Sequence, residues 1–329
     1  MFVHESQLRH VLRPEHYYSE EHYRRELEHV LQPGWHPVAT LAELPRGGRF
    51  VARTLLGRPL LLRRAGDEVH AFLNACAHRR RDDDHLAGVR SALCGELVFV
   101  CLADEGPSLE EQLGPHFAYL AESFAPPWRQ VWAWEADYAA NWKVPLENGL
   151  ESYHIPCLHA RTFGDYPQER NVEHELHETW TTYTTTEMDR WVKKAVRRAT
   201  RWLGLPSTGT YTHLHVFPNL TFVSMDTFRM AQPVWPTSAT TSSTRVWVFA
   251  PFGPRRGVIP WLFAHGNALA VAGVARRVLH EDAPIFPDAQ RGLEASVCRG
   301  VMGRREERLH VFQEYVARRC GADTADPAG

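Results

Sequence analysis

Residues 141–159 read NWKVPLENGLESYHIPCLH, and this segment carries the strongest chemical signal in the chain. Its spacing is helical, so that residues three and four apart share one face. His154 and His159 are separated by four residues, and both imidazoles can converge if the helix loosens near Pro156. Glu151 lies one turn before His154, where its carboxylate can hold the imidazole ring. Two neutral imidazoles suit a divalent metal such as iron.

The histidine pair has a simpler interpretation if it is taken alone. Histidines on a surface helix, each with ordinary hydrogen-bond partners, give the same H-x-x-x-x-H pattern without any metal. The choice between the two therefore depends on the rest of the sequence.

Composition limits the classes of function that the chain can have. A length of 329 residues with 44% hydrophobic content allows a large core, in one large domain or two linked ones. The net charge of -2 gives no basic surplus for nucleic acid or an anionic membrane. No stretch is expected to span a bilayer, and residues 1–11 are too polar for a signal peptide. We therefore expect a cytoplasmic protein that acts on a small molecule, with its six cysteines as thiols or metal ligands.

The texture of the sequence changes twice along the chain. A helical pattern over residues 20–31 ends at a proline and glycine, and residues 35–105 then favour a small all-β module. Its expected strands are 49–55, 58–63, 69–74 and 96–102. From residue 131 onward, alternating and helical segments interleave, which indicates an α+β domain. The alternating segments are 175–185, 211–225 and 243–249, and the helical ones are 147–159, 190–203, 262–280 and 304–319.

The segment at 141–159 resembles the iron-site motif of the Rieske ring-hydroxylating oxygenases, N-W-K-x-x-x-E-N-x-x-[DE]-x-Y-H-x-x-x-x-H, with every fixed position present. Residues 17–31, 43–45, 215–220 and 304–315 are similar to other parts of that family. The resemblance implies an α+β fold with a Rieske-like antiparallel β module and a helix-grip catalytic domain, in which an antiparallel sheet curves around a long helix. It divides the chain into an N-terminal helical arm (1–34), a degenerate Rieske-like module (35–130) and a mononuclear iron domain (131–329).

The resemblance also assigns roles to individual residues. It makes His154 and His159 ligands of Fe(II) and places Asn148 beside the open coordination positions. Glu151 takes the acidic position that, in the family, links a ligand histidine to the Rieske cluster of the next subunit. Asp282 lies in a segment that resembles the family's E-D-x-x-I motif, which implies that it is the third ligand, although an acidic residue beginning a helix would look the same. Such a two-histidine, one-carboxylate facial triad leaves positions open for dioxygen as cosubstrate.

The chain departs from the family in the β module. A Rieske cluster needs two cysteines and two histidines, supplied as C-x-H and a later C-x-x-H. Cys76 and His78 form the first pair, but Cys94 is followed three residues later by Leu97, and a block of sequence is missing. The first interpretation is a relic without a [2Fe-2S] cluster, with Cys94 buried as a small hydrophobic residue. The others are a structural zinc bound by Cys76, His78, His85 and Cys94, or an intact cluster built from the remnant.

Without a cluster, the iron needs another source of electrons. We expect an oxygenase or oxidase in which the substrate or a direct reductant supplies the electrons. Two alternatives stay open. The chain could be a non-catalytic ligand-binding relic of the family, or an oxygenase fed by a cluster-bearing partner subunit. The family assembles as rings of three, so a homotrimer is expected. The substrate stays unknown, because the inward faces of Tyr211, His213, His215, Phe222, Met225 and Trp247 cannot be assigned from sequence.

Overall fold

The computed structural model describes residues 9–74, 86–162, 171–187, 190–255, 257–303 and 305–321. The chain separates into two compact units. One consists of Leu27–Ala125, and the other combines Met1–Glu26 with Pro126–Gly329.

The Leu27–Ala125 unit is built on a six-stranded antiparallel sheet with the order β1-β6-β5-β4-β3-β2. Alternation in β3 explains its packing, since Leu60 and Leu62 are fully buried while their neighbours are not. The strands β2 and β3 meet at a two-residue turn in which Leu56 has φ 49° and Gly57 φ 74°, the positive pair that a tight hairpin requires. The strands are β1 (Trp35–Thr40), β2 (Val51–Leu55), β3 (Arg58–Ala65), β4 (Glu68–Leu73), β5 (Gly88–Cys94) and β6 (Leu97–Cys101). Two helices follow them, α2 (Leu109–Leu113) and α3 (Phe117–Ser123).

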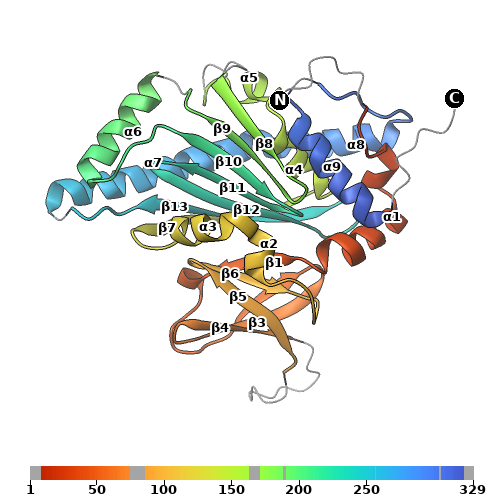
Figure 1. Cartoon of the computed structure of the whole chain (residues 1–329), viewed down its shortest axis with the longest axis horizontal. Coiled ribbons are helices and arrows are strands. Elements are labelled where there is room, and N and C mark those ends of the chain that lie inside the picture. Colours follow the sequence, from red (N-terminus) through yellow and green to blue (C-terminus); the bar gives the residue numbers. More distant parts are fainter. Residues whose placement is uncertain are drawn as a thin grey trace. The chain divides into compact units, whose positions relative to one another are not determined.

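The second unit is built on a seven-stranded antiparallel sheet with the order β7-β13-β12-β11-β10-β9-β8 (Figure 1). Two of the alternating segments seen in the sequence each contain a hairpin, because the chain turns at residues 177–179 and 217–219. The strands are β7 (Trp128–Tyr138), β8 (Val172–Leu176), β9 (Trp180–Thr185), β10 (Tyr211–Val216), β11 (Leu220–Met225), β12 (Phe228–Pro236) and β13 (Ser242–Pro251).

A long helix, α7 (Val258–Asp282), runs along this sheet (Figure 1). It packs on β13, where Val246 and Val248 form one core cluster with Ala275 and Leu279 of the helix. The other α-helices of this unit are α1 (Glu20–Glu26), α4 (Lys143–Leu150), α5 (Ile155–Leu158), α6 (Arg190–Leu203), α8 (Phe286–Ala295) and α9 (Glu307–Cys320), and a π-helical turn (Leu27–Leu31) follows α1 at the start of the Leu27–Ala125 unit. The predicted α+β fold, an antiparallel β module with an antiparallel sheet against a long helix, is confirmed.

The expectation that no stretch of the chain is long and apolar enough to span a bilayer was wrong. The helical run Val258–Ala295 is long and apolar enough to cross a membrane by length and composition, and it is the one such run in the described ranges. Buried core helices and signal sequences can pass the same test. The run packs on β13 through Ala275 and Leu279, but only 17% of its most apolar stretch is buried, so packing accounts for a small part of its apolar character.

Candidate metal centre

The helix predicted over residues 147–159 is broken into α4 and α5. The break begins at Glu151, which is extended (φ −105°, ψ 178°), and α5 starts after His154. Pro156 explains it, because in a continuous helix its ring would clash with the carbonyl group of Ser152 and lack the N–H for that bond. In the observed structure Pro156 lies in the first turn of α5, where a proline is tolerated. The expected loosening therefore occurs, but before His154 and not at the proline itself.

The break lets His154 and His159 flank the single turn of α5 and face a common partner. His154 is the residue before the first turn, and His159 follows the last. Both present Nε2 to Oδ1 of Asp282, at 4.0 Å for His154 and 2.9 Å for His159. One ligand atom from each of the three residues lies within 4.8 Å of the others. The structure thus brings together the three residues that the sequence predicted as iron ligands.

Each histidine is held from its other ring nitrogen by a carboxylate. Nδ1 of His154 contacts Glu151, three residues earlier, and Nδ1 of His159 lies 2.8 Å from Oε2 of Glu281. Burial alone would lower the pKa of His159, but the carboxylates of Asp282 and Glu281 outweigh burial and raise that pKa. The metal-free site therefore favours a proton that a metal ion would have to displace.

The donor set fits a divalent metal ion. Oδ1 of Asp282 is buried, and it lies 2.9 Å from Nε2 of His159. Two ligand atoms bound to one ion at about 2.1 Å and at right angles would lie about 3 Å apart. Carboxylate-held imidazoles that present Nε2 are the usual form of histidine metal ligands. Two histidines and one carboxylate suit Fe(II).

Glu281 was not predicted as a site residue. Its carboxylate also accepts hydrogen bonds from Thr162 Oγ1, at 3.0 Å, and from Arg277 Nε, at 2.9 Å. The signal that could have revealed it is the acidic pair Glu281-Asp282, in which one carboxylate can bind the metal and the other can orient a ligand. The sequence pointed only to the second of these two residues.

Helix α4, which carries Asn148, approaches the sheet at His213. Asn148 is half-buried on α4, next to Gly149, where an added Cβ would lie 3.7 Å from Nε2 of His213. Directly opposed residues on neighbouring strands point to the same face of a sheet. His213 pairs with Val223 of β11, Val223 with Met230 of β12, and Met230 with Val248 of β13, which packs against α7. The α7 side of the sheet therefore carries Tyr211, His213, His215 and Met225, while Phe222 and Trp247 lie on the opposite side.

An arginine is buried on the same side of the sheet. Arg308 of α9 is 2% exposed, and its guanidinium donates hydrogen bonds to Nδ1 of His213 at 2.8 Å and to Thr181 Oγ1 at 3.2 Å. Burial lowers the pKa of Arg308 to about 9, and burial with the adjacent Arg308 charge holds the pKa of His213 far below its ordinary value. His213 is therefore a neutral hydrogen-bond acceptor at pH 7.

The first three residues of the motif build the support for the site. Lys143 is fully buried, and its ammonium group donates to Glu26 Oε1 at 2.6 Å and to the carbonyl group of His16 at 2.9 Å. The indole N–H of Trp142 donates to the other oxygen of Glu26 at 2.7 Å. Asn141 accepts a hydrogen bond from the N–H of Lys143 at 3.0 Å. This buried network joins α1 to the start of α4, the helix that leads into the metal centre.

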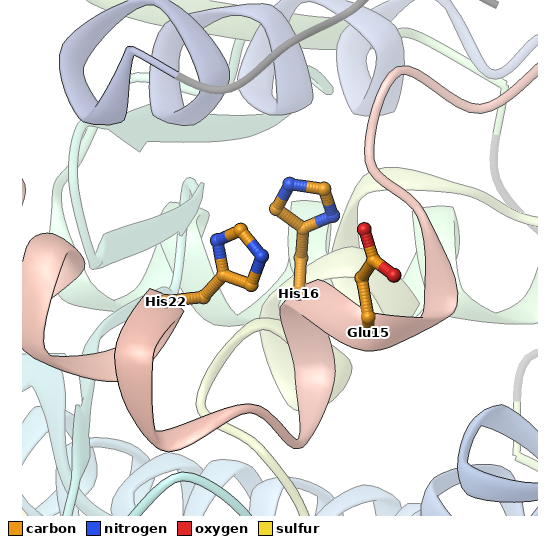
Figure 2. A group of neighbouring side chains, drawn as sticks. All are labelled: Glu15, His16 and His22. Atoms are coloured by element: carbon orange, nitrogen blue, oxygen red, sulfur yellow. The ribbon is translucent and has the colours of Figure 1, made fainter. Parts of the chain in front are cut away.

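A second group of potential ligands lies near the N-terminus, where Glu15, His16 and His22 neighbour one another (Figure 2). His16 is the third residue of a short 3₁₀ helix, Pro14–Tyr17, and its Nδ1 accepts the N–H of Arg13, the residue that caps this helix, at 3.0 Å. Burial and the nearby His22 and Lys143 lower the pKa of His16 to about 4, which indicates surroundings hostile to positive charge. These contacts suit a neutral capping residue better than a metal ligand.

The predicted cluster remnant is only partly visible. Cys76, His78 and His85 lie outside the described residues. Cys94, at the end of β5, is 1% exposed and its thiol donates to the carbonyl group of Phe117 at 3.6 Å. Burial raises the pKa of Cys94 to about 12, so the thiolate that a metal would need is disfavoured.

Most of the second unit matches a known family. Residues 126–322 match the family described as "Ring hydroxylating alpha subunit (catalytic domain)". The chain belongs to this family of oxygenases. Its catalytic domain is therefore that of a non-haem iron oxidoreductase, and the His154, His159 and Asp282 group fits the facial triad.

Relatives among characterised proteins are distant. The carnitine monooxygenase oxygenase subunit of Acinetobacter pittii is 25% identical over 211 residues, which cover 50% of this chain and 56% of that relative. The methanesulfonate monooxygenase hydroxylase subunit alpha of Methylosulfonomonas methylovora is 36% identical, but over only 64 residues, 19% of this chain and 16% of the relative. The matched region thus spans little more than half the length of the first of these relatives.

Solved structures show the same fold at low sequence identity. A crystal structure of the quaternary ammonium Rieske monooxygenase CntA with an inhibitor has a TM-score of 0.74 at 19% identity, covering 93% of this chain and 94% of that chain. A naphthalene 1,2-dioxygenase bound to phenanthrene has a TM-score of 0.69 at 17% identity, covering 97% and 94%. These likenesses extend the shared fold beyond the catalytic unit to most of the chain.

Changing Glu281 to glutamine should weaken metal binding without removing a ligand. The amide keeps the size of the side chain but loses the charge that orients His159, and losing such a partner usually costs about 10- to 100-fold in metal affinity. Competition with a fluorescent chelator would measure the Fe(II) affinity. Glu294→Gln on α8 is the matched control and should bind Fe(II) like the unmodified protein. Equal affinities of both variants would contradict the assigned role.

Proposed function

We propose that this protein is a mononuclear non-haem Fe(II) oxygenase or oxidase that acts on a small organic substrate with O2 and works without a Rieske cluster. The observation that supports it most is the convergence of His154, His159 and Asp282 with both imidazoles held by carboxylates. A chain that had lost its chemistry would have no packing reason to keep ligand atoms of two histidines and a carboxylate within 4.8 Å of one another.

The state of the Leu27–Ala125 unit supports the proposed loss of the cluster. Leu97 occupies the position where the second ligand pair would have its histidine, and it is fully buried in β6. Cys94 is buried and hydrogen-bonded as a thiol, which favours a packing role over a place in a cluster or in a zinc set with Cys76, His78 and His85. We therefore regard the unit as a degenerate Rieske-like module.

The residues of the chain divide the work between binding and positioning. Fe(II), bound by His154, His159 and Asp282, would supply the activation of dioxygen at the positions that these ligands leave open. Glu151 and Glu281 fix the orientation of the two imidazoles. Asn148 and the α7 side of the sheet, including Tyr211, offer a wall against which a small substrate can be oriented and shielded from water.

Electrons then come from the substrate itself or from a small reductant that reacts directly. Without a relay, a reaction in which the substrate supplies all the electrons for dioxygen, such as desaturation, ring closure or oxidative cleavage, needs no protein partner. The homotrimer expected from the family would in that case have no electronic purpose, and light scattering would measure whether it persists. A cytoplasmic location is part of the same proposal.

The purified protein is expected to contain no [2Fe-2S] cluster and to turn over without ferredoxin or reductase. Reconstitution with iron and sulfide under anaerobic conditions should leave one iron per chain and no visible sulfide-to-iron charge-transfer bands, because half of the ligand set is missing. Cys76→Ser should leave the iron content unchanged, and Cys298→Ser, at an exposed cysteine, is its matched control. A chromophore that Cys76→Ser removes, or activity that requires a ferredoxin, would refute the proposed loss of the cluster.

A further inference from the structure

Helix α6 is strongly amphipathic and strongly basic. Val196, Thr200 and Leu203 form its buried side. Its full sequence, RWVKKAVRRATRWL, supplies six cationic side chains and no acidic one. No ion pair within the described ranges involves these six side chains, which are Arg190, Lys193, Lys194, Arg197, Arg198 and Arg201. Their charge is therefore directed to the surroundings of the protein.

These cations form a groove with a residue from the start of the α7 region. The groove has a volume of about 740 Å³ and is lined by Lys194, Arg197, Arg198, Arg201, Trp202 and Arg255. The side chain of Arg255 lies against Gly204, where an added Cβ would come within 2.9 Å of it. The groove is thus a concentrated positive surface on a chain whose net charge is -2.

Large apolar side chains also stand exposed on α6 and on the first turns of α7. Trp191 of α6 is 64% exposed, and at the start of α7 Val258 is 74% and Trp261 57% exposed. Trp202 joins the two helices by stacking on Phe263, with ring centroids 5.3 Å apart. Further along α7, Leu262 and Leu269 continue the exposed stripe. Monomeric proteins rarely leave such a patch uncovered, so it marks an interaction surface.

The combination identifies the kind of partner. Basic amphipathic helices flanked by exposed tryptophan and aliphatic side chains bind at the interface of anionic membranes, where the cations meet lipid phosphates and the apolar residues enter the acyl boundary. A second copy of this chain fits less well, because two such grooves would repel each other. The metal ligand Asp282 lies at the other end of α7, and a helix of its length extends ~37 Å, so the patch is separate from the metal centre.

We propose that α6 and the first turns of α7 form a peripheral binding surface for anionic lipid membranes. Helix α7 does not need to span the bilayer, since it packs on β13 through Ala275 and Leu279. This departs from the expectation drawn from net charge, because a total near neutrality conceals the local clustering of cations. The proposal does not depend on the identity of the substrate or on the source of electrons.

Sedimentation of the full-length protein with vesicles tests the proposal. Vesicles of phosphatidylcholine with phosphatidylglycerol should bind the protein, pure phosphatidylcholine vesicles should bind it weakly, and salt should weaken the binding. Removing two arginines in Arg197→Gln/Arg201→Gln should lower the partition coefficient on the order of 30-fold, since each cation near the surface contributes about fivefold. Trp261→Ser should also lower it, which a purely electrostatic anion groove would not show.

Matched variants and other ligands make the result decisive. Arg24→Gln/Arg25→Gln removes two exposed arginines from α1 and should bind vesicles like the unmodified protein, while circular dichroism verifies that all variants are folded. The proposal is overturned if anionic vesicles do not bind the protein, or if both double variants bind equally well. It is also overturned if the protein binds inorganic phosphate but no vesicles. The same holds if the protein binds no vesicles and light scattering shows a dimer that dissociates in the Trp261→Ser variant.

Discussion

Replacing His154 or Asp282 by alanine is expected to abolish stoichiometric Fe(II) binding. Each substitution removes one of the three proposed protein ligands of the metal. The loss in Fe(II) affinity should therefore exceed the roughly 10- to 100-fold loss that follows removal of a residue that only orients a ligand. Asp282→Ala should have a further effect on the metal-free protein, because the carboxylate that raises the pKa of His159 is gone. The pKa of His159 should then fall, which NMR titration of the imidazole would measure.

Anaerobic loading with Fe(II), gel filtration and metal analysis would give the iron content per chain. Two substitutions of the same types serve as controls, Asp288→Ala on α8 and His70→Ala on β4, both at exposed positions. These should retain one iron per chain. Full iron occupancy in either His154→Ala or Asp282→Ala under the same loading would show that the three residues are not the ligand set.

Lys143→Met should be the most destabilising single substitution in the motif. It leaves the carboxylate of Glu26 buried without its cation, and breaking a buried pair in this way costs about 3–5 kcal/mol. The free energy of unfolding, measured with urea, should fall by that amount, and the melting temperature should fall on the order of 10 °C. Iron binding at low temperature should survive in the folded fraction, because Lys143 contacts no ligand.

The partner substitution separates loss of the pair from loss of packing. The double variant Glu26→Gln/Lys143→Met removes both charges and keeps an oxygen that can accept the indole N–H of Trp142, so it should recover part of the lost free energy. Lys193→Met, at an exposed lysine of α6, should change the free energy of unfolding by less than about 0.5 kcal/mol. A Lys143→Met protein as stable as Lys193→Met would show that the buried network contributes nothing to folding.

Much of the fold could be predicted because its signals are local. Alternation and glycine turns located the strands β2 to β4, and the helical pattern over residues 190–203 gave α6 with the bounds that the structure has. Sequence patterns were less informative where a proline or a short turn interrupts a regular period. The hairpins within residues 175–185 and 211–225 keep their alternation through the turn, so each looked like a single segment.

The metal centre could be predicted only as far as its ligands. His154, His159 and Asp282 lie in recognisable segments, but the orienting role of Glu281 depends on contacts with His159 across more than a hundred residues of sequence. The buried side of the sheet was equally inaccessible, because strand parity becomes meaningful only when the register with β13 and α7 is known. The exposed basic surface was concealed for a different reason, since the net charge averages over the whole chain.

The single turn of α5 between its two histidines makes the length of this spacer more important than its composition. Inserting or deleting one residue between His154 and His159 would rotate one imidazole by about 100° relative to the other and point it away from Asp282. The side chains of Pro156 and Cys157 are exposed and contribute little to the ligand geometry. Homologous chains should therefore tolerate substitutions within this spacer while excluding gaps, and an engineered one-residue insertion should be as damaging as the loss of a histidine.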